Sequence, residues 1–298
     1  MASIDDNVYF VNRGKNSEIQ GLLAQITTSG SRSGTELVYD KAHMSVFQAI
    51  ILAIIEGITE FLPISSTAHL LLTGKLIGLA STGFIKTFDI AIQFGAILAV
   101  VALYWRQLLD RAIQMRLLAA FLPTMFLGAL LYSFVKNVLF ENIWLILGAL
   151  FFGGIVLIIL EWLHREPEDA HSELPSIPLP TCFAIGIFQS IAMVPGVSRA
   201  AATIAGGLLL GLRRKTIVEF SFLLAVPTMA AATALDLFKG GFMFSVQETS
   251  MLLIGGVVTF ITALTVIKFL LRYIVNHTFI PFAVYRMALA VLFALSIL

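Results

Sequence analysis

From Met44 onward, long apolar segments alternate with short polar ones. Six of the apolar segments have the ~17–25 residues that an α-helix needs to cross a bilayer. They are Phe88–Tyr104, Leu117–Val135, Ile143–Leu163, Ile217–Phe238, Ser250–Leu271 and Ile280–Leu298. The pattern therefore predicts an all-α membrane protein with about six transmembrane helices.

Two further apolar regions, Val46–Leu79 and Thr181–Leu212, are interrupted near the middle by proline and hydroxyl residues. Each half is too short to cross the membrane. Non-helical backbone at membrane depth is tolerated only where protein buries it or a wet cavity meets it. We therefore expect two re-entrant helix–loop–helix hairpins.

The two interrupted regions also resemble each other. Sliding one onto the other places Glu56 on Gln189, Ser65 on Ser198, Ser66 on Arg199 and Thr73-Gly74 on Gly206-Gly207. Gln189 would then be a hydrogen-bonding remnant of the repeat. This predicts one membrane domain, residues 44–298, made of two inverted repeats (44–164 and 180–298), each a hairpin followed by three spans.

Positive charge is concentrated in alternate loops, which are cytoplasmic by the positive-inside rule. The basic residues of these loops are Arg106, Arg111, Arg116, Arg165, Arg213, Arg214, Lys215, Lys268 and Arg272, whereas the other loops hold only Lys86, Lys136 and Lys239. An odd number of spans per repeat inverts the second repeat. The hairpins then enter from opposite faces, and their tips meet near the midplane.

Composition supports the membrane assignment, because 58% of residues are hydrophobic and 12% are charged, against about 25% charged in soluble domains. The net charge of +1 says nothing about nucleic acid, and no basic run suggests a nucleic-acid partner. Cys182 has apolar neighbours and is expected to be an inert buried thiol. Residues 1–43 are polar and rich in Ser, Gly and Thr, so we expect a dispensable extension or start artefact without fixed structure.

The first interrupted region carries polar groups that are expensive inside a membrane and therefore indicate function. Glu56 and Glu60 are four residues apart, which places them on one helix face. Pro63 ends that helix, and Ser65, Ser66 and Thr67 can cap the next one and contact phosphate. His69 lies three residues beyond Ser66. Asp89 and Asp236, near span ends, are expected to be interfacial, and Trp105, Trp144 and Trp162 are expected to anchor the spans at the interface.

The second interrupted region carries an anion-binding pattern, Pro195-Gly196-Val197-Ser198-Arg199. Gly196 permits a tight turn, Ser198 can cap the following helix, and Arg199 offers a fork that matches phosphate oxygens. Thr203 lies one turn further on. Facing carboxylates would repel a phosphate unless they are protonated or a divalent cation lies between. Oxygen ligands favour Mg²⁺ or Ca²⁺.

The stretch Glu56–His69, EGITEFLPISSTAH, resembles the glutamate-rich signature of the undecaprenyl pyrophosphate phosphatases, the bacitracin-resistance family. The Pro195–Arg199 segment resembles that family's second signature, and the likeness covers Met44–Leu298. The resemblance implies metal-dependent hydrolysis of a C55 polyprenyl diphosphate in the bacterial inner membrane. This activity recycles the lipid carrier for cell-wall synthesis and confers bacitracin resistance.

The resemblance also implies roles for individual residues. Glu60 would be the essential acid and metal ligand, supported by Glu56. Ser66 and His69 would be the nucleophile candidates, and Arg199 the phosphate clamp, with Ser198 and Thr203 beside it. Where the family usually has Ser-Gly after the arginine, this chain has Ala200-Ala201, so one phosphate-facing hydroxyl is missing.

Three mechanisms stay open at this level. Ser66 attacks with His69 as its base, His69 attacks directly, or Glu60 activates water. A polyprenyl-phosphate flippase is the alternative function, because inverted repeats with broken helices are also transporter architecture. The resemblance favours a site open to the outer, periplasmic side, and a homodimer is compatible with the sequence.

Overall fold

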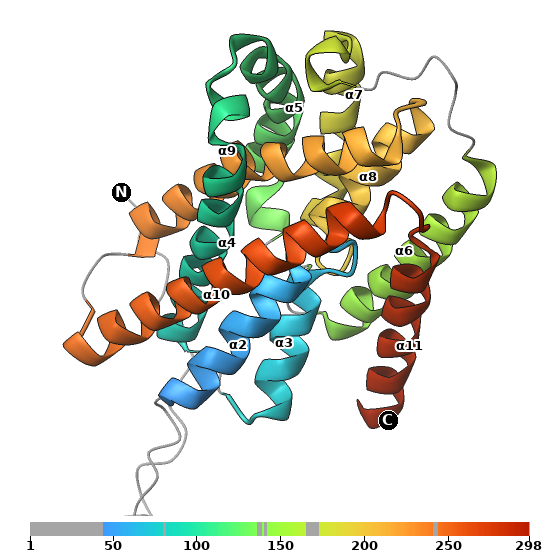
Figure 1. Cartoon of the computed structure of the whole chain (residues 1–298). Helices are drawn as coiled ribbons and strands as arrows, with labels where there is room; N and C mark the ends of the chain where they lie inside the picture. Colours follow the sequence, from blue (N-terminus) through green and yellow to red (C-terminus); the bar gives the residue numbers. More distant parts are fainter. Residues whose placement is uncertain are drawn as a thin grey trace, which may run out of the picture. The chain divides into compact units, whose positions relative to one another are not determined.

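The computed structural model describes residues 44–79, 82–135, 139, 142–164, 173–240 and 244–297 (Figure 1). Every regular element in these ranges is helical. The expected extension at 1–43, Arg165, Lys136 and the side chains of Asp236 and Lys239 lie outside the described residues.

Within the described ranges, six helices are long and apolar enough to cross a membrane, as predicted. They are α4 (Gly83–Leu109), α5 (Arg111–Phe134), α6 (Ile143–Leu163), α9 (Arg214–Gly240), α10 (Val246–Tyr273) and α11 (Ile280–Ile297). Several begin before the apolar segment that predicts them, because capping decides where a helix starts. Thr82 caps α4 through the Ile85 amide, and Ser245 forms a capping box with Glu248 at α10.

The two interrupted regions form pairs of short helices. The first hairpin is α2 (Val46–Thr59) and α3 (Ser66–Leu76), and the second is α7 (Leu179–Ser190) with η3 (Ile191–Met193) and α8 (Arg199–Leu209), after the short η2 (Leu174–Ser176). The longest of these helices has 14 residues, or about 21 Å of rise. That is short of the ~30 Å hydrocarbon core, so none of them can cross alone.

The hairpins share an unusual backbone conformation at equivalent positions. Ser65 has φ 71° and Ser198 has φ 76°, and among the described residues these are the non-glycine positions with positive φ. At the far end of each hairpin, Gly78 has φ 70° and Gly211 has φ 78°. Ser65 and Ser198 are separated by the same number of residues as Gly78 and Gly211. The alignment of Ser65 on Ser198 thus matches the three-dimensional structure.

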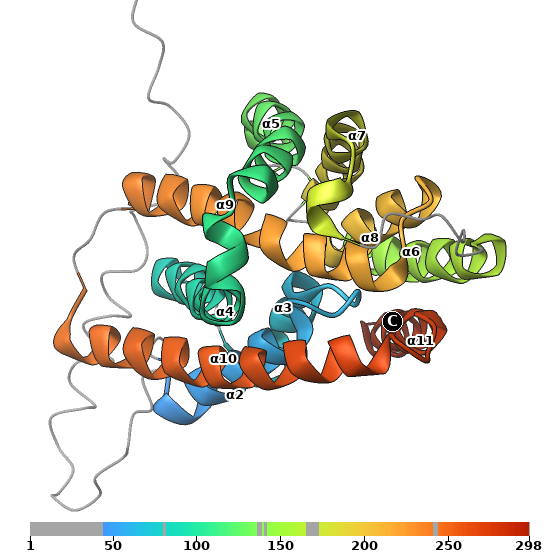
Figure 2. The ribbon, with the colours of Figure 1, turned by 45° about the horizontal axis from the view of Figure 1, so that its top comes forward.

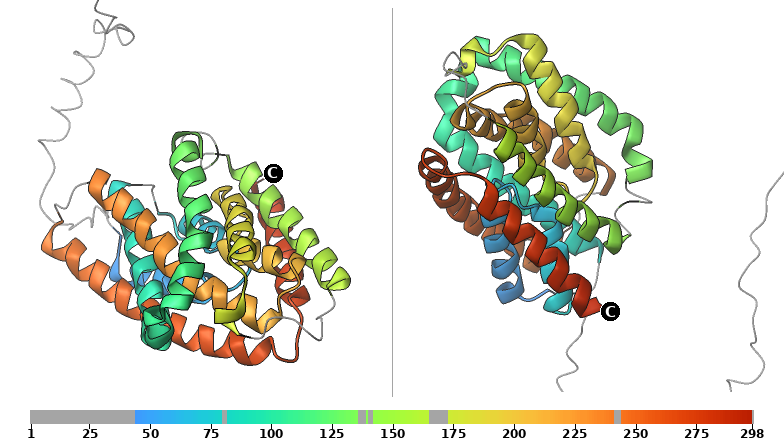
Figure 3. Two further views of the ribbon diagram at one scale, coloured as in Figure 1. Left: turned by 90° about the horizontal axis from the view of Figure 1, so that it is seen from above. Right: turned by 90° about the vertical axis from the view of Figure 1, so that its right-hand side faces the viewer.

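Packing repeats in the same way (Figure 2). The α2 helix packs on α10, and its counterpart α7 packs on α5. Thr259 of α10 donates a hydrogen bond to the Ala53 carbonyl (3.0 Å), and Thr124 of α5 donates to the Gly186 carbonyl (2.9 Å). The last helices of the two halves are α6 and α11, and they lie against each other in both views of Figure 3.

The hairpins insert from opposite ends of the helix bundle. Gln48 donates to the Ile77 carbonyl (3.2 Å) and so closes the base of the first hairpin, which shares a packed cluster with Phe88 at the start of α4. Arg116, in the first turns of α5, donates to the Ile177 carbonyl (2.7 Å) just before α7. Since α5 begins where α4 ends, the second base lies at the other end. The two hairpins therefore enter from opposite ends, which is the placement that inverted repeats predict.

Candidate active site

The two hairpin tips meet and enclose a cavity of about 160 Å³. The first tip is defined here as Glu60–Thr67 and the second as Val194–Arg199. The cavity is lined by Glu60, Ser65, Ser66 and Thr67 of the first tip, Gly196, Ser198 and Arg199 of the second, and Gln93, Ala192 and Met229 of their neighbours. Seven residues predicted from separate signatures therefore surround one space.

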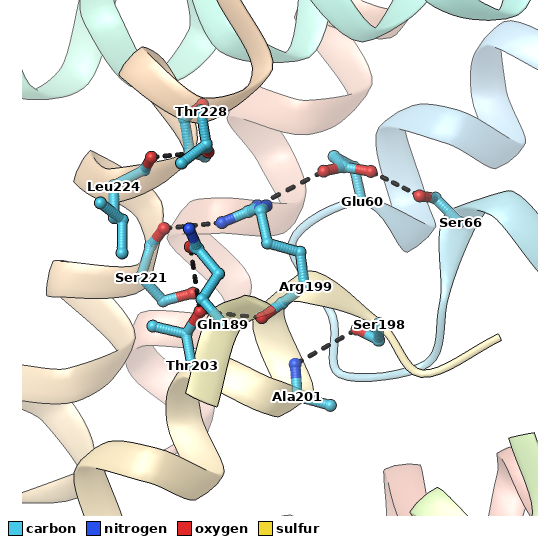
Figure 4. A network of polar contacts seen from close by, with 11 residues as sticks. Glu60, Ser66, Gln189, Ser198, Arg199, Ala201, Thr203, Ser221, Leu224 and Thr228 are labelled. Atoms are coloured by element: carbon cyan, nitrogen blue, oxygen red, sulfur yellow. Dashed lines mark hydrogen bonds and ion pairs between the residues drawn. The ribbon is translucent and has the colours of Figure 1, made fainter. Parts of the chain in front are cut away.

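Glu60 joins the two tips (Figure 4). Its Oε2 accepts a hydrogen bond from the Ser66 hydroxyl, and its Oε1 lies 3.4 Å from Nη2 of Arg199. Glu60 is 7% exposed and the Arg199 side chain is 13% exposed, so both groups are largely shielded from solvent yet reach the cavity. The carboxylate can take a proton from the serine while the guanidinium compensates charge.

Arg199 is held in place from behind. Its Nη1 donates to the Ser221 carbonyl of α9 (2.7 Å), and its Cζ lies 5.8 Å from the ring centroid of Phe61. Its Nε is buried without a hydrogen-bond partner among the described residues. The guanidinium is thus anchored on one side and keeps donor capacity for an anion.

Two helix N-termini point into the site. Ser198 caps α8 by accepting from the Ala201 amide (3.2 Å), whereas the Ser65 side chain makes no capping bond to the described part of α3. First-turn amides lack intrahelical acceptors and carry the positive end of the helix dipole. A phosphate between the tips would meet both ends, which is favourable for anion binding.

His69 does not line the cavity. Its Nδ1 lies 2.7 Å from the Ser65 carbonyl and its Nε2 lies 2.9 Å from the Tyr285 hydroxyl, so both ring nitrogens are engaged. The ring also stacks on Tyr285, with centroids 5.6 Å apart. Ser66 and His69 share a helix face as expected, but the hydroxyl of Ser66 is bonded to Glu60. In this structure His69 braces the backbone of Ser65.

Glu56 lies one turn before Glu60 and is fully buried. Neither of its carboxylate oxygens has a hydrogen-bond partner among the described residues. Such a group needs a proton or a cation. In the described ranges, no three His, Cys, Asp or Glu side chains gather into a metal cage. A cation here would take its other ligands from substrate or water, as Mg²⁺ commonly does.

Thr203 and Gln189 lie behind the second tip rather than in the cavity. The Thr203 hydroxyl contacts Gln189 Oε1 (3.2 Å) and the Arg199 carbonyl (2.9 Å). Gln189 in turn donates to Thr124 (3.1 Å). The pair braces the start of α8, and Gln189 makes hydrogen bonds at the position where the first repeat has the unpartnered Glu56.

Sequence reasoning missed Gln93 and Arg286. Gln93 reaches the cavity from α4, and Arg286 of α11 is fully buried against both tips. Each is a polar residue inside an apolar span, and that signal alone marks a functional candidate.

These features define an integral membrane protein with a phosphoryl-transfer type of site, in which a carboxylate, a hydroxyl and an arginine converge from two re-entrant hairpins. Comparison with known proteins agrees. Residues 49–292 match the family described as bacitracin resistance protein BacA, and the chain belongs to that family.

The curated relatives below share one name, and the match covers nearly the whole length of each. The undecaprenyl-diphosphatase of Sulfurihydrogenibium sp. is 48% identical over 252 residues, which cover 85% of this chain and 99% of the relative. That of Aquifex aeolicus is 47% identical over 252 residues (84% and 98%), and that of Thermus thermophilus is 45% identical over 255 residues (84% and 97%).

Proposed function

We propose that this chain is an undecaprenyl-diphosphatase, which hydrolyses the C55 lipid diphosphate to the monophosphate and inorganic phosphate. The observation that carries the proposal is the contact of Ser66, Glu60 and Arg199 across the two tips. The names of the relatives support the substrate. A transporter needs no hydroxyl bonded to a carboxylate, so this contact favours the enzyme over the flippase.

The contacts support Ser66 as the nucleophile and Glu60 as its base. The Ser66 oxygen attacks the terminal phosphorus while Glu60 accepts the hydroxyl proton, and the bond to the bridging oxygen breaks. The lipid monophosphate leaves with that electron pair. Water then attacks the phosphoserine, which releases inorganic phosphate and restores Ser66.

Arg199 and the helix N-termini stabilise the charge that develops on the transferred phosphoryl group. The arginine is anchored by the Ser221 carbonyl, so it needs little rearrangement when the phosphate arrives. Gly196 and Ser198 bring the second tip close to the same group. His69 contributes by holding the Ser65 carbonyl.

Divalent-metal dependence is part of the proposal. Glu60 on the cavity and Glu56 beneath it would hold Mg²⁺ or Ca²⁺, and the unpartnered oxygens of Glu56 fit this need. The cation, when bound, would neutralise phosphate charge. A chelator should abolish phosphate release, and adding back Mg²⁺ or Ca²⁺ should restore it. Full activity in the chelator would refute the metal dependence.

We also propose that the protein lies in the bacterial inner membrane with the cavity open to the outer side. Arg116 and Arg214 lie at the bundle end that holds the base of the second hairpin, which supports a cytoplasmic position for that end. A Thr67→Cys variant should react with a membrane-impermeant thiol reagent added to spheroplasts. If the variant is labelled only after lysis, the cavity opens to the cytoplasmic side and the proposed orientation is wrong.

The central test uses the purified protein in detergent with undecaprenyl diphosphate labelled in its terminal phosphate. The wild type should release phosphate and, after a rapid acid quench, retain label on the protein. The Ser66→Ala variant should show neither. Phosphate release without protein-bound label would assign the attack to water. No release by the wild type under any metal condition would refute the proposed function.

A further inference from the structure

A second arginine lies behind the tips. Arg286 is 0% exposed and has no carboxylate within ion-pair distance in the described part of the chain. Its guanidinium donates to backbone carbonyls instead. The acceptors are Leu150 (2.9 Å), Ala149 (3.2 Å), Pro63 (3.2 Å), Gly196 (2.7 Å) and Val197 (3.1 Å).

Three of these five acceptors belong to the tips. Pro63 lies in the first tip just before the positive-φ Ser65, and Gly196 and Val197 immediately precede the positive-φ Ser198. The two acceptors of α6 fix the guanidinium to the surrounding bundle. A buried charge without a counterion is tolerated only when its donors are satisfied, so moving either tip away would leave a buried donor unpaired at a cost in free energy.

We infer that Arg286 is a positioning residue for the reaction: it fixes the two tips relative to each other so that Ser66 and Arg199 reach the same phosphate. This inference rests on the proposed phosphatase function. Arg286 does not line the cavity and therefore acts through the tip backbone. Ser66 and Arg199 come from different halves of the chain, and the guanidinium bonds to both tips.

The α6 helix offers a way to displace this guanidinium without changing its charge. A Cβ atom added at Gly153 would lie 2.6 Å from Arg286 Nη2 and 3.0 Å from its Cζ, so the guanidinium would have to move. A Cβ added at Gly148, on the same helix, would meet nothing within 4 Å. Gly153→Ala and Gly148→Ala are therefore a matched pair.

The expected effect lies mainly in kcat. We expect substrate binding to tolerate a shift between the tips, whereas the transition state needs Ser66 and Arg199 on the same phosphate, and a displacement of about 1 Å can cost roughly 10²-fold in rate. Arg286→Met should lower kcat by about 100-fold and change KM by less than about threefold. Arg286→Lys keeps the charge and up to three donors, so it should retain an intermediate kcat.

The test measures kcat, KM and thermal unfolding in detergent for these four variants and the wild type. Gly153→Ala should lower kcat about tenfold, and Gly148→Ala should match the wild type. An inactive wild type would count against the proposed function and not against the role of Arg286.

Two results would overturn the inference. One is a Gly153→Ala variant with the kcat of Gly148→Ala. The other is a loss in Arg286→Met that disappears once activity is divided by the folded fraction, which would make the arginine merely structural. Should Arg286→Met fail to fold, the glycine pair still decides.

Discussion

The sharpest single perturbation of the site is Glu60→Gln. The amide has nearly the same size as the carboxylate but no charge, and one of its two polar atoms is a donor. If the amide nitrogen faces Arg199, two donors oppose each other. If it faces Ser66, the hydroxyl loses its proton acceptor. Neither orientation can replace the pair of contacts that Glu60 makes.

The contacts set the expected magnitude. General-base assistance contributes about 10²–10⁴-fold, and a hydrogen bond to a charged group contributes about 1.5–3 kcal/mol. Together they predict a fall in kcat of at least about 10³-fold. The Arg199 side chain is 13% exposed and is also bonded to Ser221. Losing the Glu60 carboxylate should therefore lower the free energy of unfolding by less than the ~3–5 kcal/mol expected for a fully buried pair. The variant should still fold.

The assay is phosphate release at saturating substrate and metal, with thermal unfolding measured in parallel. Glu161→Gln is the matched control. Glu161 is 7% exposed, pairs with Arg214 at 2.8 Å and accepts from the Phe279 amide, away from the cavity. It should lose stability while keeping its kcat per folded molecule. A Glu60→Gln enzyme within tenfold of the wild-type kcat would refute the base assignment.

Three further predictions follow from the contacts. Arg199→Lys keeps the charge but not the bidentate fork, so it should lower kcat about 10²-fold. When it is combined with Ser66→Ala, the losses in kcat should be strongly non-additive. Additive losses above the assay floor would mean that the two residues do not share a site. His69→Gln can still bond the Ser65 carbonyl and should cost far less than Ser66→Ala in a phosphate-release assay, and equal losses would restore His69 as a reacting group. Gly95→Ala would place a Cβ 2.4 Å from the Gly256 carbonyl and should destabilise the protein by about 1–3 kcal/mol in a detergent melt, whereas Gly256→Ala meets nothing within 4 Å and should not.

The fold follows from the sequence because apolar length is a direct physical requirement of the bilayer. Six spans and two interrupted hairpins could be predicted from it. Helix starts were less predictable. The α4 helix begins at Gly83, five residues before the predicted Phe88, because Thr82 supplies a cap outside the apolar segment.

Seven of the residues that line the cavity could be named from the sequence, but their contacts could not. Spacing alone pairs Ser66 with His69, since residues three apart share a helix face. The structure pairs Ser66 with Glu60 across the turn at Ser65. Ser65 has a φ of 71°, and a serine in the sequence does not predict this backbone conformation. Arg286 stands out in the sequence as a charge inside an apolar span, but its role was not predictable, because its partners are backbone carbonyls and leave no complementary side chain to find.

The matching backbone at Ser65 and Ser198 has a consequence for how such an enzyme could arise. Ser66 and Arg199 each follow one of these serines and begin a helix. They therefore occupy equivalent positions in the two repeats. Two identical copies would place two hydroxyls, or two cations, across the cavity. Divergence at this position, together with a Glu60 that only the first copy carries, gives one half an attacking hydroxyl and the other a neutralising cation. Division of labour between the copies also implies that neither half is active by itself.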